Sequence, residues 1–369
     1  MTQPDNQLES DLPKAAGRNG VWLRWLAGLA IGALFVWWSA RSWPLDTLLR
    51  GRLSLDRNSS GDLALILRDG SGPATWSLAL WAIAAYGLVL VVIHWLRVMR
   101  WRPMLAPFGG ASLRVCNRVG AVGFMAVFLL PLRLGELVRP LLLARNTEIA
   151  FGTGLSTIAV ERVLDGLVVS LALFLVLLQV PQSQLARFPE VQVGAFVALA
   201  VFAGALILLG ATALARQATI ALLRGVIGRV SGGLAERIIG LVTTFVDGLT
   251  VLRSPLAIAQ FLLLTVAYWG INGVGVWLMA RGFGLDVPLS AGYAMMCTVV
   301  VGMMIPNSPG NVGSFWTFLL LPAGLWGVHG DAPAAVVFGL AVWLMQTVQV
   351  SLFGAWGLWA DARARGAQP

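Results

Sequence analysis

The chain has 369 residues, of which 58% are hydrophobic and only 12% are charged. A soluble domain usually carries about 25% charged residues, so this composition and the mean hydropathy of +0.80 exclude a soluble enzyme and a disordered protein. The net charge is +9, and the arginines are scattered between apolar runs without forming a continuous basic stripe. Nucleic acid is therefore not an expected partner, whereas an anionic lipid surface is.

The N-terminal part of the chain contains a polar tail, an apolar run and a polar segment. Residues 1–20 predict a flexible cytoplasmic tail. The run at about 21–40 predicts an uncleaved first transmembrane helix, because no small-residue cleavage site follows it. Residues 41–74 are polar, and leucines alternate on both sides of the turn at 59–62, which predicts a small hairpin in an external loop.

Apolar runs dominate the rest of the chain. Five are long enough to span a bilayer, at 75–96, 154–180, 191–212, 256–280 and 331–359. Three are shorter, at 116–130, 289–305 and 312–328, and the first two end at Pro131 and Pro306. These short runs predict segments that enter the membrane and turn back. Residues 213–255 predict two amphipathic helices, which lie on the membrane surface or form a cytoplasmic hairpin packed on the bundle.

Arginine counts predict the topology. Loop 97–118 has five arginines and no acid, and loop 212–255 has five arginines and two acids, so both are expected in the cytoplasm. Both can be there only if 116–130 is re-entrant. The same logic at 289–328 places the C-terminal tail, residues 361–369, in the cytoplasm with the N-terminus, and places 41–74 outside.

An internal repeat supports this arrangement. Pro131 and Pro306 are 175 residues apart, and the same offset aligns the apolar runs on either side of them. The aligned runs cross in opposite directions, as in the inverted repeats of transporters. The predicted fold is an all-α polytopic integral membrane bundle over residues 21–360, with inverted repeats and two re-entrant broken helices.

Two clusters of charge lie at the first broken segment. Glu136 and Arg139 are spaced i,i+3 and would face each other on one helical turn, while Glu161 and Asp165 share a helix face with Arg162 within reach of Asp165. In hydrocarbon such charges cost a few kcal/mol each unless they are paired or hydrated. Two interpretations stay open, a cavity for a charged head group or an ion-pair network that fixes packing. Arginine also suits lipid phosphate, and the candidate substrate-binding residues here are Arg133, Glu136, Arg139, Glu161, Arg162 and Asp165.

The second broken segment is uncharged but rich in glycine, proline and polar side chains. Non-helical backbone at membrane depth is tolerated only inside protein or beside water. Asn311 or Ser314 can cap the following short helix, and the alternative is a tight loop needed only for folding. The candidates here are Asn307, Pro309, Gly310, Asn311 and Ser314. Asn272, Gln346 and Gln349 are interpreted as interhelical hydrogen-bonding residues rather than ligands, and His94 as an interface residue.

Cys116 and Cys297 both lie in apolar runs and are predicted to be unpaired thiols. No metal site, cofactor or nucleotide-binding loop is expected from the residues present. Any transport by this protein would therefore be passive or coupled to an ion rather than driven directly by ATP.

Several motifs resemble a known family. The runs at 133–140 and 159–165, which read RLGELVRP and AVERVLD, resemble the membrane domain of lysylphosphatidylglycerol synthase/flippase proteins and their stand-alone relatives. Pro309, Gly310 and Gly313 match a later motif, although Ser314-Phe315-Trp316 stands where the family often has a glutamate.

The resemblance implies lipid handling in the inner membrane and no lysine transfer, because the chain ends soon after the last span without an aminoacyl-transferase domain. The expected function is a flippase-like, non-enzymatic transporter of an amphipathic lipid, either anionic or isoprenoid-linked. The alternatives are an intramembrane lipid-phosphate enzyme and an accessory scaffold of a lipid/glycan pathway. The oligomeric state stays open.

Overall fold

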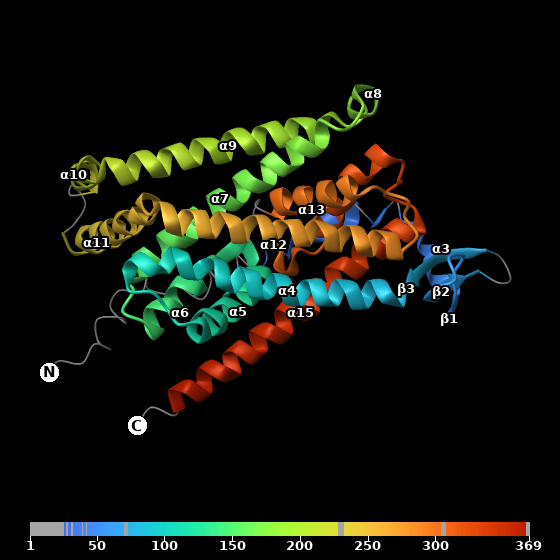
Figure 1. The fold of residues 1–369 in the computed structure, drawn as a ribbon, viewed down its shortest axis with the longest axis horizontal. Coiled ribbons are helices and arrows are strands. Elements are labelled where there is room, and N and C mark those ends of the chain that lie inside the picture. The colour runs from blue at the N-terminus through green and yellow to red at the C-terminus, as the bar shows by residue number, and fades with distance from the viewer. Residues whose placement is uncertain are drawn as a thin grey trace.

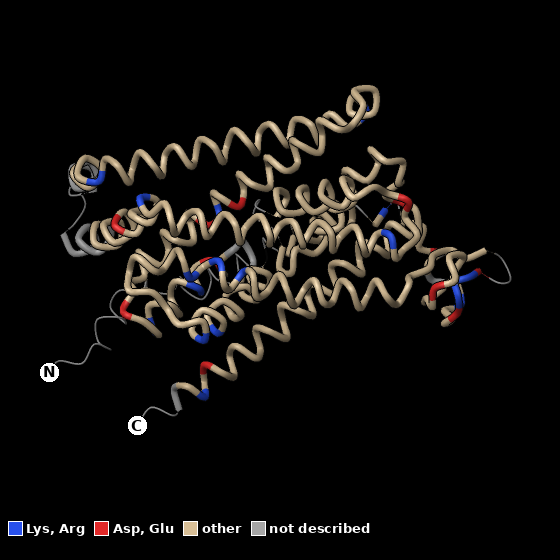
Figure 2. Tube along the Cα trace, in the orientation of Figure 1, with Lys and Arg blue, Asp and Glu red and all other residues tan. Residues whose placement is uncertain are grey.

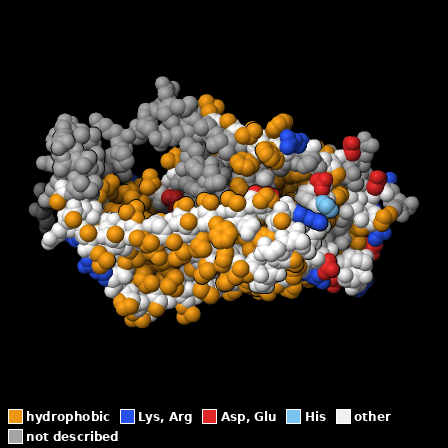
Figure 3. Space-filling view, turned by 90° about the horizontal axis from the view of Figure 1, so that it is seen from above, with side chains coloured by type: hydrophobic (Ala, Val, Ile, Leu, Met, Phe, Trp, Pro, Cys, Tyr) orange, Lys and Arg blue, Asp and Glu red, His pale blue; other side chains and the backbone are white. Residues whose placement is uncertain are grey.

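The structure is a computed structural model that describes residues 26, 29–30, 32–38, 40–41, 43–69, 73–227, 232–303 and 308–366. It is a helical bundle with a small sheet at one end (Figure 1). Four of the described helices are long and apolar enough to cross a membrane, at Leu80–Phe108, Pro189–Leu214, Pro255–Gly282 and Pro333–Ala364. Figure 3 shows one face on which hydrophobic side chains cover the middle and charged side chains gather mainly towards the two ends. The predicted all-α membrane bundle is confirmed.

The sheet confirms the predicted hairpin and adds a third strand. After the short helix α3 (Leu45–Arg50), β1 (Arg52–Arg57) pairs antiparallel with β2 (Leu63–Arg68), and Leu55 lies opposite Leu65. Strand β3 (Ala74–Ala79) pairs with the other edge of β2. The first residues of the apolar run at 75–96 therefore belong to a strand, and the helix that follows begins only at Leu80.

The first repeat consists of a long helix, a broken segment and a second long helix. Its elements are α4 (Leu80–Leu105), η1 (Ala106–Phe108), α5 (Leu113–Leu129), η2 (Pro131–Leu137), α6 (Val138–Asn146) and α7 (Phe151–Leu177). The Ser112 side chain caps α5 by accepting the Val115 N–H at 3.3 Å. Leu130 ends the helix in an extended conformation, with φ −82° and ψ 140°, as the residue before a proline prefers.

Gly135 allows the chain to turn back along α5. A Cβ at this position would lie 2.1 Å from the carbonyl carbon of Ala126, so any side chain would force η2 away from α5. Helix α6 then packs on both α5 and α7. The α5–η2–α6 unit therefore enters the bundle and returns, as predicted for the first broken segment.

The second repeat follows the same order. Its described elements are α12 (Pro255–Gly282), α13 (Leu289–Met303), η4 (Pro309–Asn311), α14 (Ser314–Leu320), η5 (Leu321–Trp326) and α15 (Pro333–Gly366). Residues 304–307, with the predicted break at Pro306, lie outside the described residues. Because α15 continues to Gly366, it passes the expected domain end at residue 360.

The two repeats are inverted relative to each other. Helices α4 and α12 run antiparallel, since Gly282 approaches Ala82 at one end while Tyr268 bonds Arg97 towards the other. Helix α5 packs on α15, α7 packs on α13, and η2 contacts η4. Each broken helix is thus covered by the last helix of the other repeat, and the two breaks meet inside the bundle.

Between the repeats, α8 (Gln182–Leu185), α9 (Pro189–Leu214), α10 (Arg216–Ile227), α11 (Gly232–Gly248) and η3 (Leu249–Arg253) complete the described chain. Helices α10 and α11 lie at the end of the bundle opposite the sheet, the end towards which α15 runs (Figure 1). Helix α11 packs on α7, where Thr153 Oγ1 donates to the Thr244 carbonyl at 3.2 Å. Helix α11 therefore packs on the bundle, and its position relative to the membrane surface stays a prediction.

Two expectations from the sequence are wrong. Arg97 and Arg100 are not loop residues but belong to α4, and the Arg100 side chain is fully buried. His94 is not at an interface, because it is buried and its Nε2 lies 2.9 Å from Asn117 Oδ1. Hydropathy places buried arginines outside a span because it cannot detect their ionic partners. The prediction that Cys116 and Cys297 are unpaired thiols is confirmed, because both are free and buried.

Candidate functional site

A buried network of arginines and carboxylates lies where α4, α6 and α7 meet. The Arg100 guanidinium donates to both carboxylate oxygens of Asp165, at 2.8 Å for Nη2 to Oδ2, and to Glu161 Oε1 at 3.0 Å. The Arg139 Nη2 group donates to Glu161 Oε2, also at 3.0 Å. All four side chains are at most 1% exposed. Figure 2 shows charged residues inside the mostly uncharged bundle at this level as well as at its ends.

Local structure explains how these charges meet. Glu161 and Asp165 are one turn apart on α7, so both carboxylates leave the same face of the helix. Gly123 on α5 leaves room for Arg139, because a Cβ there would lie 2.0 Å from Arg139 Cγ. The Arg139 guanidinium lies 4.3 Å from the Trp101 ring centroid and 4.9 Å from that of Phe124. Aromatic faces therefore complete the surroundings of a cation that is already paired.

Arg162 lies at the edge of this network and is 32% exposed. Its Nη2 donates to Glu161 Oε1 at 2.9 Å, and its Nε lies 4.0 Å from Glu136 Oε2. The predicted contact of Arg162 with Asp165 is present as a longer 4.0 Å pair. Glu161 thus contacts three guanidinium groups, which is the arrangement that makes a buried carboxylate tolerable in a bilayer.

The sequence predicted that Glu136 and Arg139 face each other, whereas in the structure Arg139 bonds Glu161. Residues 131–137 form a 3₁₀ helix, so the register expected from one α-helical turn does not apply, and Arg139 extends towards α7 to bond Glu161. Of Arg133 the structure describes only the backbone, which lies in η2.

The second broken segment contributes backbone groups and uncharged side chains to the same region. Gly310 has φ +69° and Asn311 has φ +51°, both in the left-handed region, and the Gly310 carbonyl accepts the Trp343 Nε1–H at 2.8 Å. The predicted capping by Asn311 or Ser314 is wrong, because the N-cap of α14 is Gly313, without a side-chain hydrogen bond. The Ser314 hydroxyl instead donates to the Asn311 carbonyl at 3.2 Å. Pro309 begins η4, and Asn307 lies outside the described residues.

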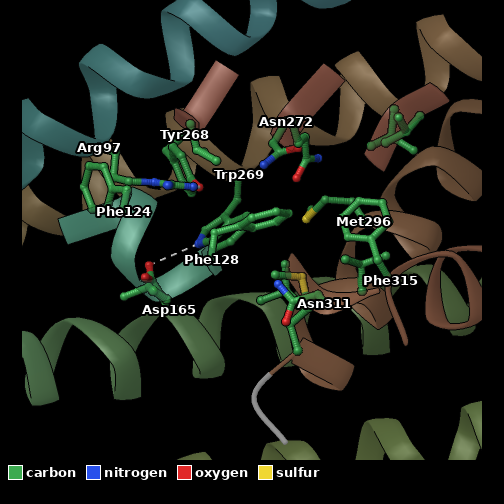
Figure 4. Close-up of a pocket in the computed structure, with 18 of the residues that line it drawn as sticks. Arg97, Phe124, Phe128, Asp165, Tyr268, Trp269, Asn272, Met296, Asn311 and Phe315 are labelled. Carbon is green, nitrogen blue, oxygen red and sulfur yellow. Dashed lines mark hydrogen bonds between the residues drawn. The ribbon is translucent and has the colours of Figure 1, made fainter. Parts of the chain in front are cut away.

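A cavity of about 150 Å³ lies where the two repeats meet. Its charged part is lined by Arg97, Arg100, Arg139, Arg162 and Asp165, all from the first repeat. Its other part is lined mainly by apolar side chains of the second repeat, including Val276, Met296, Val299 and Phe315, with Asn272 and Asn311 among them. Figure 4 shows Arg97 and Asp165 well apart from Met296 and Phe315 in this space. The cavity is therefore amphipathic, with a cationic part and an apolar part.

Arg97 lines the cavity, although the sequence did not indicate it as a site residue. Its Nε donates to Tyr268 Oη at 3.2 Å, and its guanidinium lies 4.5 Å from the Phe124 ring centroid. Within the described part of the chain, no carboxylate pairs with it. An arginine inside a membrane bundle with a hydroxyl and two rings as its neighbours is suited to receive an anion.

Arg100 and the aromatic residues Tyr268 and Trp269 were also missed. The Trp269 Nε1–H donates to Asp165 at 3.1 Å, and the Arg100 guanidinium lies 4.5 Å from the Tyr268 ring centroid. A usable signal was present in the sequence, because Arg97 and Arg100 are spaced i,i+3 directly after the apolar run at 75–96 and continue its helix. Gln346 donates to Tyr86 at 2.8 Å, which confirms its predicted interhelical bond.

The guanidinium and carboxylate groups of this site can form ion pairs and bind a charged ligand. Among the described residues, no group of three or more His, Cys, Asp and Glu side chains could hold a metal ion.

Comparison with known proteins shows the family to which the chain belongs. Residues 25–354 match the family described as the lysylphosphatidylglycerol synthase TM region. The chain belongs to this family.

The chain is also similar to part of a longer protein. The glycosyltransferase AglD of Haloferax volcanii is 26% identical over 261 residues, which cover 63% of this chain and 42% of AglD. The chain thus matches less than half the length of that relative. No solved structure matches the chain. The family places this protein in the membrane, and the matched region is a transmembrane one.

Proposed function

We propose that this protein transports an amphipathic lipid with an anionic head group between the leaflets of the membrane. The observation that carries the proposal is the amphipathic cavity at the junction of two inverted broken helices. Its cationic part is suited to a phosphate, its apolar part to the beginning of an acyl or isoprenoid chain, and discontinuous helices at the repeat interface are typical of transport sites.

Arg97 is the proposed primary contact for the head group. Arg100 and Arg139 already hold Glu161 and Asp165, so their charges are largely compensated inside the protein. Arg97 has no such compensation among the described residues and lines the cavity. A lipid phosphate at this position would supply the counter-charge that the protein leaves out.

The test is leaflet exchange in proteoliposomes. Purified wild-type protein is expected to expose an inner-leaflet fluorescent anionic phospholipid to an impermeant quencher faster than protein-free vesicles do. Arg97→Gln should slow this exchange at least tenfold while the protein elutes from gel filtration as the wild type does. Exchange at the protein-free rate with well-folded wild type, for anionic and isoprenoid-linked lipids alike, would reject the transport function.

A second proposal is an accessory role in a lipid-linked glycan pathway. It is supported by the similarity to part of AglD, a protein named as a glycosyltransferase. In that role the cavity would hold the lipid carrier without moving it. Tight lipid binding that depends on Arg97, without any leaflet exchange, would favour this second function over the first.

A further inference from the structure

Two buried carboxamides in the cavity have no side-chain hydrogen-bond partner among the residues that the structure describes. Asn272 on α12 and Asn311 in η4 are each 7% exposed and line the cavity. Within the described part of the chain, neither side chain makes a hydrogen bond, although the backbone of Asn311 does. A buried amide without a hydrogen bond costs free energy, so such groups in native proteins face water or a ligand.

The position of these amides relative to the arginines is defined by α12. Tyr268, which bonds Arg97, and Asn272 are spaced i,i+4, so Asn272 lies one turn, or about 6 Å, farther along the same face. Figure 4 shows Asn272 and Asn311 on opposite sides of the cavity, both apart from Arg97 and Asp165. The cavity therefore has a second polar region, next to the cationic one and uncharged.

The chemistry of this second region favours hydroxyl groups. A carboxamide offers both donors and an acceptor, which matches a hydroxyl that donates one hydrogen bond and accepts others. A phosphate accepts only, and it is better served by the arginines. A cation would require carboxylates, and the surrounding side chains of Val276, Met296 and Phe315 are apolar.

We infer that Asn272 and Asn311 bind the hydroxyl groups of a polyol attached to the lipid phosphate. The ligand class is thus an anionic lipid whose phosphate carries a glycerol, an inositol or a sugar. This inference rests on the proposed head-group site, since it assumes that the phosphate lies beside Arg97. The separation of about one helical turn is of the order of the distance from a phosphate to a hydroxyl on an attached polyol.

The test compares lipids with the same acyl chains but different head groups, bound to the purified full-length protein and quantified by native mass spectrometry. Phosphatidic acid has the phosphate alone, phosphatidylglycerol adds a diol, and phosphatidylinositol adds a ring polyol. The wild type should prefer a polyol-bearing lipid over phosphatidic acid about tenfold, as one net hydrogen bond provides. A preference for phosphatidylglycerol identifies glycerol as the source of the hydroxyls, and a preference for phosphatidylinositol identifies a ring.

Two variants remove the amides without straining the backbone. Asn272→Leu is close to isosteric, and Asn311→Gly suits the left-handed φ of +51° at that position. Each should reduce the preference to about twofold or less while phosphatidic acid binds within twofold of wild type. Gln179→Leu removes a carboxamide that lies outside the cavity, and it should preserve the full preference.

Equal losses of phosphatidic acid and polyol-lipid binding in both variants would overturn the inference, as would a wild type without preference. Leaflet exchange of the same lipids separates this inference from the proposed function. Selective binding that depends on the amides but occurs without exchange rejects transport and retains the polyol site. If leaflet exchange occurs at the same rate and with the same lipid preference in both amide variants, transport is retained and the polyol site is rejected.

Discussion

Arg100 on α4 and Asp165 on α7 are 65 residues apart in sequence and form a two-point ion pair inside the bundle, with Nη2 to Oδ2 at 2.8 Å. Trp269 of the second repeat donates to the same carboxylate, so this pair also connects the two halves of the protein. Because both side chains are buried away from bulk solvent, each charge depends on the other.

Breaking this pair should destabilise the protein more than any exposed pair does. Arg100→Met leaves Asp165 without its principal counter-charge, at an expected cost of about 3–5 kcal/mol. The double variant Arg100→Met/Asp165→Leu should recover part of that loss. Thermal unfolding in detergent, followed by size-exclusion chromatography, measures both. The exposed pair Arg281–Asp286 is the control, and Arg281→Gln should change stability by less than about 1 kcal/mol. A stable Arg100→Met single variant would contradict the pairing.

Glu161 should matter more for folding than Glu136. Glu161 is fully buried between three guanidinium groups, whereas Glu136 is 20% exposed and lies 4.0 Å from Arg162. Glu161→Gln is expected to lower the yield of folded protein severalfold, and Glu136→Gln is expected to lower it little. A double-mutant cycle on Arg139 and Glu161 should give a coupling of at least about 1.5 kcal/mol. Coupling near zero in that cycle would show that the buried geometry is wrong.

Gly135 should tolerate no side chain. In Gly135→Ala the new methyl group would lie 2.1 Å from the Ala126 backbone, and backbone cannot move aside as a flexible side chain does. The expected cost is at least about 1–3 kcal/mol, with loss of lipid exchange. Gly87→Ala is the matched control in α4, because nothing lies within 4 Å of a Cβ built there, and it should be neutral or slightly stabilising. Equal thermal midpoints for the two variants would argue against the close turn at η2.

The sheet and the end of α15 should be accessible from opposite sides of the membrane. Their placement at opposite ends of the bundle requires this. The arginines of α4 and α5 that are not part of the buried network, Arg102, Arg114 and Arg118, favour the α10–α11 end as cytoplasmic. In intact cells an impermeant thiol reagent should label Ser60→Cys, and it should label Ala362→Cys only after permeabilisation. Native Cys116 and Cys297 are buried and provide the unlabelled background. Labelling of position 60 only from inside would reverse the proposed orientation.

The amino-acid sequence by itself determined the class, the repeat and four of the membrane-spanning helices. Long apolar runs, the prolines that end short runs, and the 175-residue offset between Pro131 and Pro306 are local or periodic features, so they can be read without knowing any contact. The motif residues Arg139, Glu161 and Asp165 were also recognisable, because charge is rare beside hydrocarbon and therefore conspicuous in the sequence.

Only the tertiary structure decided which charges pair and which groups remain for a ligand. The sequence places Arg100 in a loop, but in the structure two carboxylates of α7 pair with it inside the bundle. Arg139 bonds Glu161, which is 22 residues away in sequence. Arg97 and Asn272 are available to a ligand because, among the described residues, no carboxylate pairs with Arg97 and no group bonds the Asn272 side chain, and no local sequence pattern contains this information. Ion pairing and hydrogen bonding act over a few ångström in space, whereas sequence patterns describe distance along the chain, so the cavity emerges only when the two repeats pack together.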